Sequence, residues 1–175
     1  MFEIKEFNPE TYRRQTRRST LIILLIFAPL AMLLSGLAVM LFGEPGGDNF
    51  RWNLGGVLAA LVLTVLLVRQ VFWSQPWMAP AVYGWQLKRS LMSVTNVMHH
   101  VKAGVVAGDP AAMKLLRFYH LGLTQMHQLD ANSSALSQMV REIDEHRAHM
   151  EALGLDTDQP RLDPAWLEAV KQIGA

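Results

Sequence analysis

The hydrophobic residues of this chain gather in its first half, in two long runs that are almost free of charge. The first run, Thr20–Phe42, has no charged residue, and the second, Leu54–Phe72, is interrupted only by Arg69 near its end. About 20 apolar residues in a helix are enough to cross the ~30 Å hydrocarbon core of a bilayer. The pattern therefore predicts two transmembrane helices, over residues 20–42 and 54–73, rather than buried helices of a soluble protein.

A short segment rich in glycine and other turn-forming residues, 43–53, joins the two runs. It is too short to fold by itself, so the two spans are expected to be antiparallel neighbours joined by a short periplasmic loop. Pro29 removes one helical hydrogen bond and is expected to bend the first span. Pairs of small residues four positions apart let helices pack closely, either within one hairpin or, alternatively, between two copies of the chain. These pairs are Ala31 with Ser35, Gly55 with Ala59, and Gly56 with Ala60.

Positive charges flank the two runs on one side, which predicts the orientation of the hairpin. Lys and Arg are concentrated in the cytoplasmic flanks of membrane helices, and the connecting segment holds only Arg51. Both termini are therefore expected in the cytoplasm. The residues to which we assign topology and lipid contact are Arg13, Arg14, Arg17, Arg18, Arg69, Lys88 and Arg89, with Trp73 and Trp77 as an interfacial aromatic belt.

Residues 1–19 are predicted to form a basic juxtamembrane N-terminal helix. Asn8 is a favoured N-cap and Pro9 suits a first helical position, so the helix is expected to start here and to run into the first span. The pair Arg17-Arg18 also resembles a twin-arginine export signal, but the apolar run after it is too long for one. Lipid contact is favoured over nucleic-acid binding, since each Lys or Arg near an anionic surface gains roughly 1 kcal/mol.

From residue 74 onward the apolar residues recur at spacings of three and four, which is typical of helices that pack on one another in water. Helix-ending and helix-starting residues at Gly108-Asp109-Pro110 and at Asn132 separate three such stripes. The stripes are Leu87, Leu91, Val94, Met98, Val101 and Val105; Leu115, Tyr119, Met126 and Leu129; and Leu136, Met139, Ile143, His146, Met150 and Leu153. Asp163-Pro164 then predicts the start of a short last helix.

Together these patterns predict an all-α membrane protein, in which a two-helix transmembrane hairpin is followed by a cytoplasmic helical domain over residues 74–175. Pro76 and Pro80 predict an extended segment where the chain leaves the membrane. The domain is expected to be an antiparallel bundle of about three helices, with a loop over residues 154–162 before the short C-terminal helix.

The composition narrows the chemistry available to this domain. The chain has no cysteine, which excludes disulfides, thiolate nucleophiles and Cys-ligated zinc. It has no Gly-rich phosphate loop and no nucleophile elbow. We therefore expect neither catalytic residues nor a cofactor.

The histidines are the only residues that suggest a metal or acid–base site. The weak metal candidates are His120, His127, His146 and His149. The last two have the spacing of a ligand pair on a helix, and a glutamate precedes each of them by four residues. The first two are placed to face the third helix, which would make that interface respond to pH. No His-Glu-x-x-His signature is present, so solvated or core histidines are favoured over a metal site.

Two acidic residues in the connecting segment, Glu44 and Asp48, suggest an alternative function. Rings of such residues line the mouths of cation channels. However, the two spans have almost no polar lining, so ordinary solvated loop acids are favoured. A homo-oligomeric channel or transporter component is one alternative function, and a His-based metal or pH sensor is another.

Three segments resemble a family of uncharacterised proteobacterial inner-membrane proteins of similar length. They are residues 9–18 (PETYRRQTRR), 43–52 (GEPGGDNFRW) and 85–90 (WQLKRS). The resemblance covers nearly the whole chain, implies a bacterial inner-membrane setting, and supplies no catalytic residues. The expected function is a non-enzymatic, membrane-anchored interaction or adaptor protein, or an accessory subunit of an inner-membrane assembly. Its expected partners are the lipid bilayer and another protein, without specific nucleic-acid binding.

Overall fold

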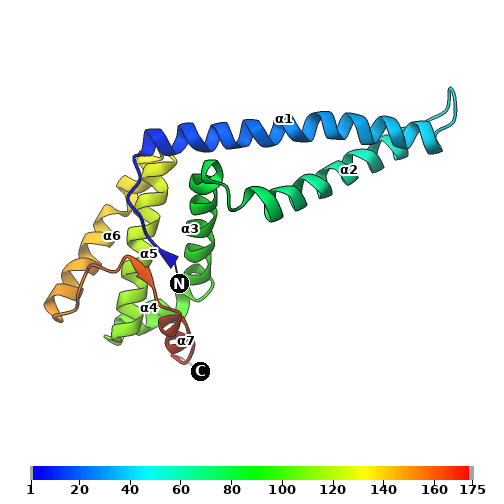
Figure 1. Ribbon diagram of the computed structural model, residues 1–175. Helices are drawn as coiled ribbons and strands as arrows, with labels where there is room; N and C mark the ends of the chain where they lie inside the picture. The colour runs from blue at the N-terminus through cyan, green and yellow to red at the C-terminus, as the bar shows by residue number, and fades with distance from the viewer. Residues whose placement is uncertain (1, 174–175) are drawn as a thin grey trace. The chain divides into compact units, whose positions relative to one another are not determined.

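The computed structural model describes residues 2–173, apart from the side chain of Ser133, and these residues are mostly helical. The helices are α1 (Pro9–Phe42), α2 (Phe50–Leu67), α3 (Ala79–Thr95), α4 (Met98–Val106), α5 (Pro110–Leu129), α6 (Ser133–Ala152) and α7 (Pro164–Lys171) (Figure 1). Two short strands are β1 (Phe2–Glu3) and β2 (Arg161–Leu162). The chain divides into a hairpin unit of residues 14–82 and a helical unit of residues 2–13 with 83–173.

Helix α1 begins where the capping residues predict. The side-chain oxygen of Asn8 accepts hydrogen bonds from the backbone N–H groups of Glu10 (3.1 Å) and Thr11 (3.0 Å). The helix then continues for 34 residues, through Pro29, into the first apolar run. A single helix therefore runs from Pro9 into the first apolar run, but it does not extend over the predicted range from residue 1, because residues 2–8 contain strand β1 and no helix.

Among residues 2–173, two helical segments are long and apolar enough to cross a membrane, Pro9–Phe42 and Phe50–Phe72. The second segment starts at Phe50, four residues earlier than the sequence pattern predicts, and its last five residues, Val68–Phe72, form a π-helix. The chain does not leave this segment in an extended conformation. A 3₁₀ turn, Pro76–Met78, leads directly into α3, whose second residue is Pro80. A proline fits there because the first helical turn needs no N–H donor.

The two spans pack through small residues on one face of α2. Gly56 lies so close to the backbone of Ser35 that a Cβ atom would overlap it. The Ser35 hydroxyl also donates to the side-chain oxygen of Asn53, at 2.7 Å. Gly56 and Ala60 are buried, whereas Gly55 and its neighbour Ala59 one turn on are exposed. The pair Gly56–Ala60 therefore packs within the hairpin, and the pair that starts at Gly55 faces outward.

The first predicted helix of the second half is in fact two helices. Helix α3 ends at Thr95 and α4 begins at Met98, so the stripe from Leu87 to Val105 crosses a break. The hydroxyl of Thr95 donates to the carbonyl of Leu91 (3.0 Å). A hydroxyl bonded to the carbonyl four residues earlier competes with the backbone hydrogen bonds of the helix. The helix ends here, and Val97 has a non-helical φ of −116°.

Helix α5 is the centre of the helical unit, since α4, α6 and α7 all pack against it. Its N-cap is Asp109, whose carboxylate accepts from the N–H of Ala112 at 2.8 Å. Asn132 caps α6 and Asp163 caps α7 in the same way, as predicted. The core residues around α5 are Val94, Val101, Ala112, Leu115, Leu116, Phe118, Leu162 and Val170. Leu153, expected in the stripe of α6, is half exposed.

A small β-pair ties the two ends of the helical unit together. Phe2 pairs with Leu162 in antiparallel register, and the Ile4 N–H donates to the Pro160 carbonyl at 2.8 Å. The sequence pattern predicts only a loop over residues 154–162. That interpretation is wrong for β2, because its partner strand lies about 160 residues away in sequence and no local pattern marks it.

Candidate functional site

Two histidines from neighbouring helices meet inside the helical unit. His120 of α5 and His146 of α6 are both buried, and their ring centroids lie 5.3 Å apart at an interplanar angle of 81°. Among the weak metal candidates, the structure brings these two together. Within residues 2–173 no three His, Asp or Glu side chains are grouped so that they could hold a metal ion.

The hydrogen bonds of the two rings differ. The Nε2 atom of His146 lies 3.0 Å from the carbonyl oxygen of Met113. A carbonyl can only accept, so this nitrogen carries a proton and donates. In contrast, Nδ1 of His120 is buried without a partner among the described residues, and its Nε2 lies 4.0 Å from a carboxylate oxygen of Glu142.

Both imidazoles are held in the neutral form. The pKa of His120 is lowered to about 4, mainly by burial and to a smaller extent by the neighbouring His146 and Arg117. Burial also lowers the pKa of His146, although the hydrogen bond to Met113 acts in the opposite direction. A buried charged imidazole would lose its hydration, which is why the charged form is disfavoured.

Arg117 is buried near the two histidines and connects α5 to the segment before β2. The side chain is 8% exposed, and its Nε atom donates to the carbonyl of Thr157 at 2.8 Å. Burial is the main cause that lowers the pKa of Arg117. The sequence pattern gives no hint of this role, because arginine is rarely buried and its partner is a backbone carbonyl 40 residues away.

A second candidate site lies on the exposed face of α3. Trp85 is 48% exposed and Met92 is 64% exposed, and they are seven residues apart on one side of the helix. The guanidinium carbon of Arg89 lies 5.1 Å from the centroid of the Trp85 ring. The opposite side of α3 is fixed in the core by Leu87 and Leu91. We call Trp85, Arg89 and Met92 the α3 face.

The sequence pattern assigns Lys88 and Arg89 to topology and lipid contact, and the structure gives both a further role. Lys88 forms an ion pair with Asp130 (3.1 Å), and Arg89 stacks on Trp85. The signal for the α3 face was available, because Trp85 and Met92 share a helical face and lie outside the buried stripe.

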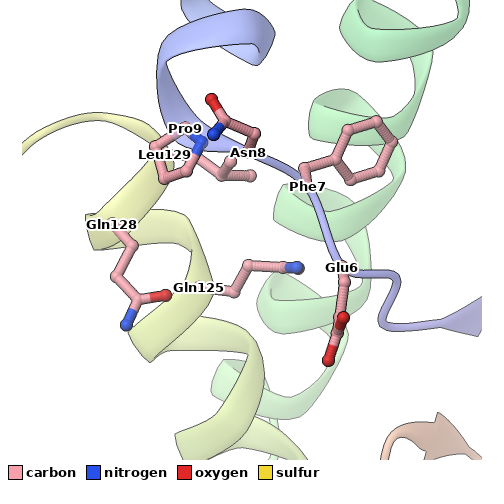
Figure 2. Close-up of a pocket in the computed structure, with 7 residues that line it drawn as sticks. All are labelled: Glu6, Phe7, Asn8, Pro9, Gln125, Gln128 and Leu129. Carbon is pink, nitrogen blue, oxygen red and sulfur yellow. The ribbon is translucent and has the colours of Figure 1, made fainter.

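An open pocket of about 500 Å³ lies in the helical unit between the N-terminal segment and the last turns of α5 (Figure 2). It is lined by Glu6, Phe7, Asn8, Pro9, Gln125, Gln128 and Leu129. Gln125 fixes the N-terminal segment beside this pocket. Its amide nitrogen donates to the Lys5 carbonyl, and its amide oxygen accepts from the Tyr83 hydroxyl. The sequence pattern missed the pocket because it forms only when residues 4–9 dock onto the helices.

The hairpin unit has polar and aromatic contacts at both of its ends. Ser19 of α1 donates its hydroxyl to the carbonyl of Trp77, at 2.8 Å. At the loop end, the Asp48 carboxylate accepts from the N–H of Phe50 at 3.0 Å, so this acid helps to start α2. Glu44 is exposed in the same loop. Trp52 stacks on Phe42, with ring centroids 5.0 Å apart.

The sequence was also compared with known proteins. No curated protein and no solved structure matches the chain. A family model does match, over residues 2–167, which is nearly the whole chain and includes both units. The chain therefore belongs to the family described as "Protein of unknown function (DUF3087)".

Proposed function

We propose that this protein is a membrane-anchored adaptor of the bacterial inner membrane. The hairpin of α1 and α2 is the anchor, and the helical unit lies in the cytoplasm and presents the α3 face to a protein partner. The observation that carries this proposal is the exposed tryptophan, Trp85, stacked with Arg89 beside Met92 on a helix whose other side is fixed in the core.

The three residue types of the α3 face are typical of protein interfaces. Trp, Arg and Met are enriched at interfaces, and Trp and Arg dominate the few positions that carry most of the binding energy. A preformed helix loses little backbone entropy when it binds, because its backbone is already ordered. The α3 face therefore has both the chemistry and the rigidity of a docking surface.

The orientation proposed for the anchor rests on the charges of α1. The four arginines at positions 13, 14, 17 and 18 precede the first apolar run, whereas the loop after it holds one arginine and two acids. Under the positive-inside rule this distribution favours a cytoplasmic location for the N-terminal segment. The helical unit contains that segment, so it shares its side of the membrane.

The experiment is site-specific photo-crosslinking in native membranes. A photoreactive amino acid replaces Met92, and in a matched control it replaces Val140, which is 46% exposed on α6. We expect one defined heterologous product from position 92 and none from position 140. The substitution Trp85→Ala is expected to weaken the partner's affinity by about 2 kcal/mol and so to remove most of that product.

A product of twice the chain's mass at position 92 would contradict the adaptor and favour a homo-oligomer. Equal products from both positions, or a product that Trp85→Ala leaves unchanged, would show that the α3 face is not the docking surface.

A further inference from the structure

The end of the hairpin opposite its loop carries four arginines that form no ion pair within the part of the chain that the structure describes. Arg14, Arg17 and Arg18 are exposed on α1, and Arg69 is exposed near the end of the second span. Among residues 2–173, none of these four guanidinium groups has a carboxylate within 4.0 Å. The hairpin unit's own acids, Glu44 and Asp48, are both in the loop at its other end.

The arginines of α1 also lie close to one another along the helix. Arg14 and Arg18 are four residues apart, as are Arg13 and Arg17, so each pair places like charges on adjacent turns. Such pairs destabilise a helix by a few tenths of a kcal/mol each. The local structure therefore provides several donors for a negatively charged group, and no carboxylate among residues 2–173 pairs with them.

If the first apolar run spans a bilayer, these arginines lie at the depth of the lipid headgroups. Arg18 is two residues before the start of the apolar run at Thr20, which is about 3 Å along a helix. The hydrogen bond from Ser19 to the Trp77 carbonyl, at 2.8 Å, places the Trp77 turn beside this part of α1. Tryptophan is enriched at the membrane–water interface. The guanidinium groups are therefore next to the apolar surface rather than far out in water.

We propose that Arg14, Arg17 and Arg18 form a binding site for the phosphate headgroup of an anionic phospholipid. The guanidinium group suits this role because it stays charged and binds phosphate oxygens through two parallel hydrogen bonds. A lipid is favoured over a nucleic acid or an acidic protein because the site begins where the apolar surface of the helix begins. This inference rests on the membrane anchor proposed above, and it adds the lipid class that the anchor binds.

The test measures lipid binding by native mass spectrometry of the full-length protein. The protein is titrated in detergent with phosphatidylglycerol or with phosphatidylcholine, and flotation with vesicles of each lipid reports insertion separately. We expect the wild-type protein to retain phosphatidylglycerol in preference to phosphatidylcholine. Each arginine replaced by glutamine should lower that preference about fivefold, which is the factor equivalent to roughly 1 kcal/mol per charge.

The matched control removes three exposed arginines from the helical unit, with the same change in net charge. It carries Arg141→Gln, Arg147→Gln and Arg161→Gln, and it should keep the wild-type preference. If the triple variant at positions 14, 17 and 18 fails to insert, the three single variants give the same measurement. An unchanged preference in those variants, or a loss equal to that of the control, would contradict the lipid site but not the membrane anchor.

Two further outcomes would also decide the question. Displacement of phosphatidylglycerol by a short RNA or by polyglutamate at equal charge would overturn the assignment to a lipid. Failure of the wild-type protein to float with vesicles of either lipid would overturn the anchor, and the lipid site with it.

Discussion

His120 is buried in the helical unit in surroundings that disfavour a charge on its ring. The ring is 1% exposed, and its Nδ1 has no partner among residues 2–173. The charged or titratable groups around it are Arg117 on its own helix and His146 and Glu142 on α6. Arg117 and His146 oppose a positive charge on the ring. Glu142 would favour one, but its carboxylate lies 4.0 Å away on a largely solvated side chain. The α5–α6 contact is therefore built for a neutral imidazole.

This arrangement predicts that the helical unit loses stability in mild acid. The pKa of His120 is lowered from 6.5 to about 4 in the folded protein. Above pH 6.5 the ring is neutral in both the folded and the unfolded chain, so the fold has its full stability there. As the pH falls from 6.5 towards 4, the unfolded chain binds the proton first and the free energy of unfolding decreases, by up to about 3 kcal/mol. Thermal unfolding followed by circular dichroism at pH 7, 6, 5 and 4 measures this loss.

The control separates His120 from the other groups that titrate in this range. His120→Gln should remove much of the pH dependence, whereas His149→Gln, at an exposed position on the same pair of helices, should leave it as in the wild type. If the His120 variant and the wild type lose stability in parallel between pH 6.5 and 4, the buried imidazole is not the cause.

At the scale of the element, the packing of α1 on α2 depends on which of two adjacent glycines is changed. A Cβ atom at Gly56 would overlap the backbone of Leu34 and Ser35, whereas one at Gly55 would have nothing within 4 Å. Alanine is the better helix former at both positions. The substitution Gly56→Ala should nevertheless destabilise the hairpin by about 1–3 kcal/mol, because backbone atoms cannot move aside as a flexible side chain can.

Gly55→Ala is the matched control, with the same chemical change one residue away. Unfolding by increasing mole fractions of SDS, followed by circular dichroism, should show a lower midpoint for Gly56→Ala and no decrease for Gly55→Ala. Equal midpoints for the two variants would mean that the hairpin does not pack through Gly56.

The elements that the sequence predicts correctly are those with local signals. Asn8, Asp109, Asn132 and Asp163 mark helix starts because the cap is a contact between a side chain and a backbone group two or three residues on. The pairing of β1 with β2 has no such signal, since each strand is two residues long. The break between α3 and α4 was missed because its apolar spacing continues through it.

The same distinction applies to the candidate sites. The stripe of α6 already includes His146, so its burial follows from periodicity. The role of Arg117 and the pocket beside Gln125 depend on contacts with distant segments. These contacts form only in the folded unit, which is why residue spacing alone could not predict them.

At the scale of the whole molecule, the two units constrain the topology of the chain. Residues 2–13 and residues 83–173 belong to one unit, although the complete hairpin lies between them in sequence. The pairing of Phe2 with Leu162 joins the two parts directly. If the hairpin spans the bilayer, an even number of crossings is required to return the chain to the side where it started, and two helices are long and apolar enough for this.

The measurement that tests the anchor most directly is the accessibility of single cysteines in whole cells. The natural chain has no cysteine, so each variant carries one reactive thiol, placed by Glu44→Cys in the exposed hairpin loop or by Gln138→Cys on the exposed face of α6. The outer membrane is made permeable, and a membrane-impermeant maleimide is added before and after lysis. Our account predicts that position 44 is labelled in intact cells and position 138 only after lysis. Equal labelling of both positions in intact cells, or labelling of position 138 alone, would contradict it.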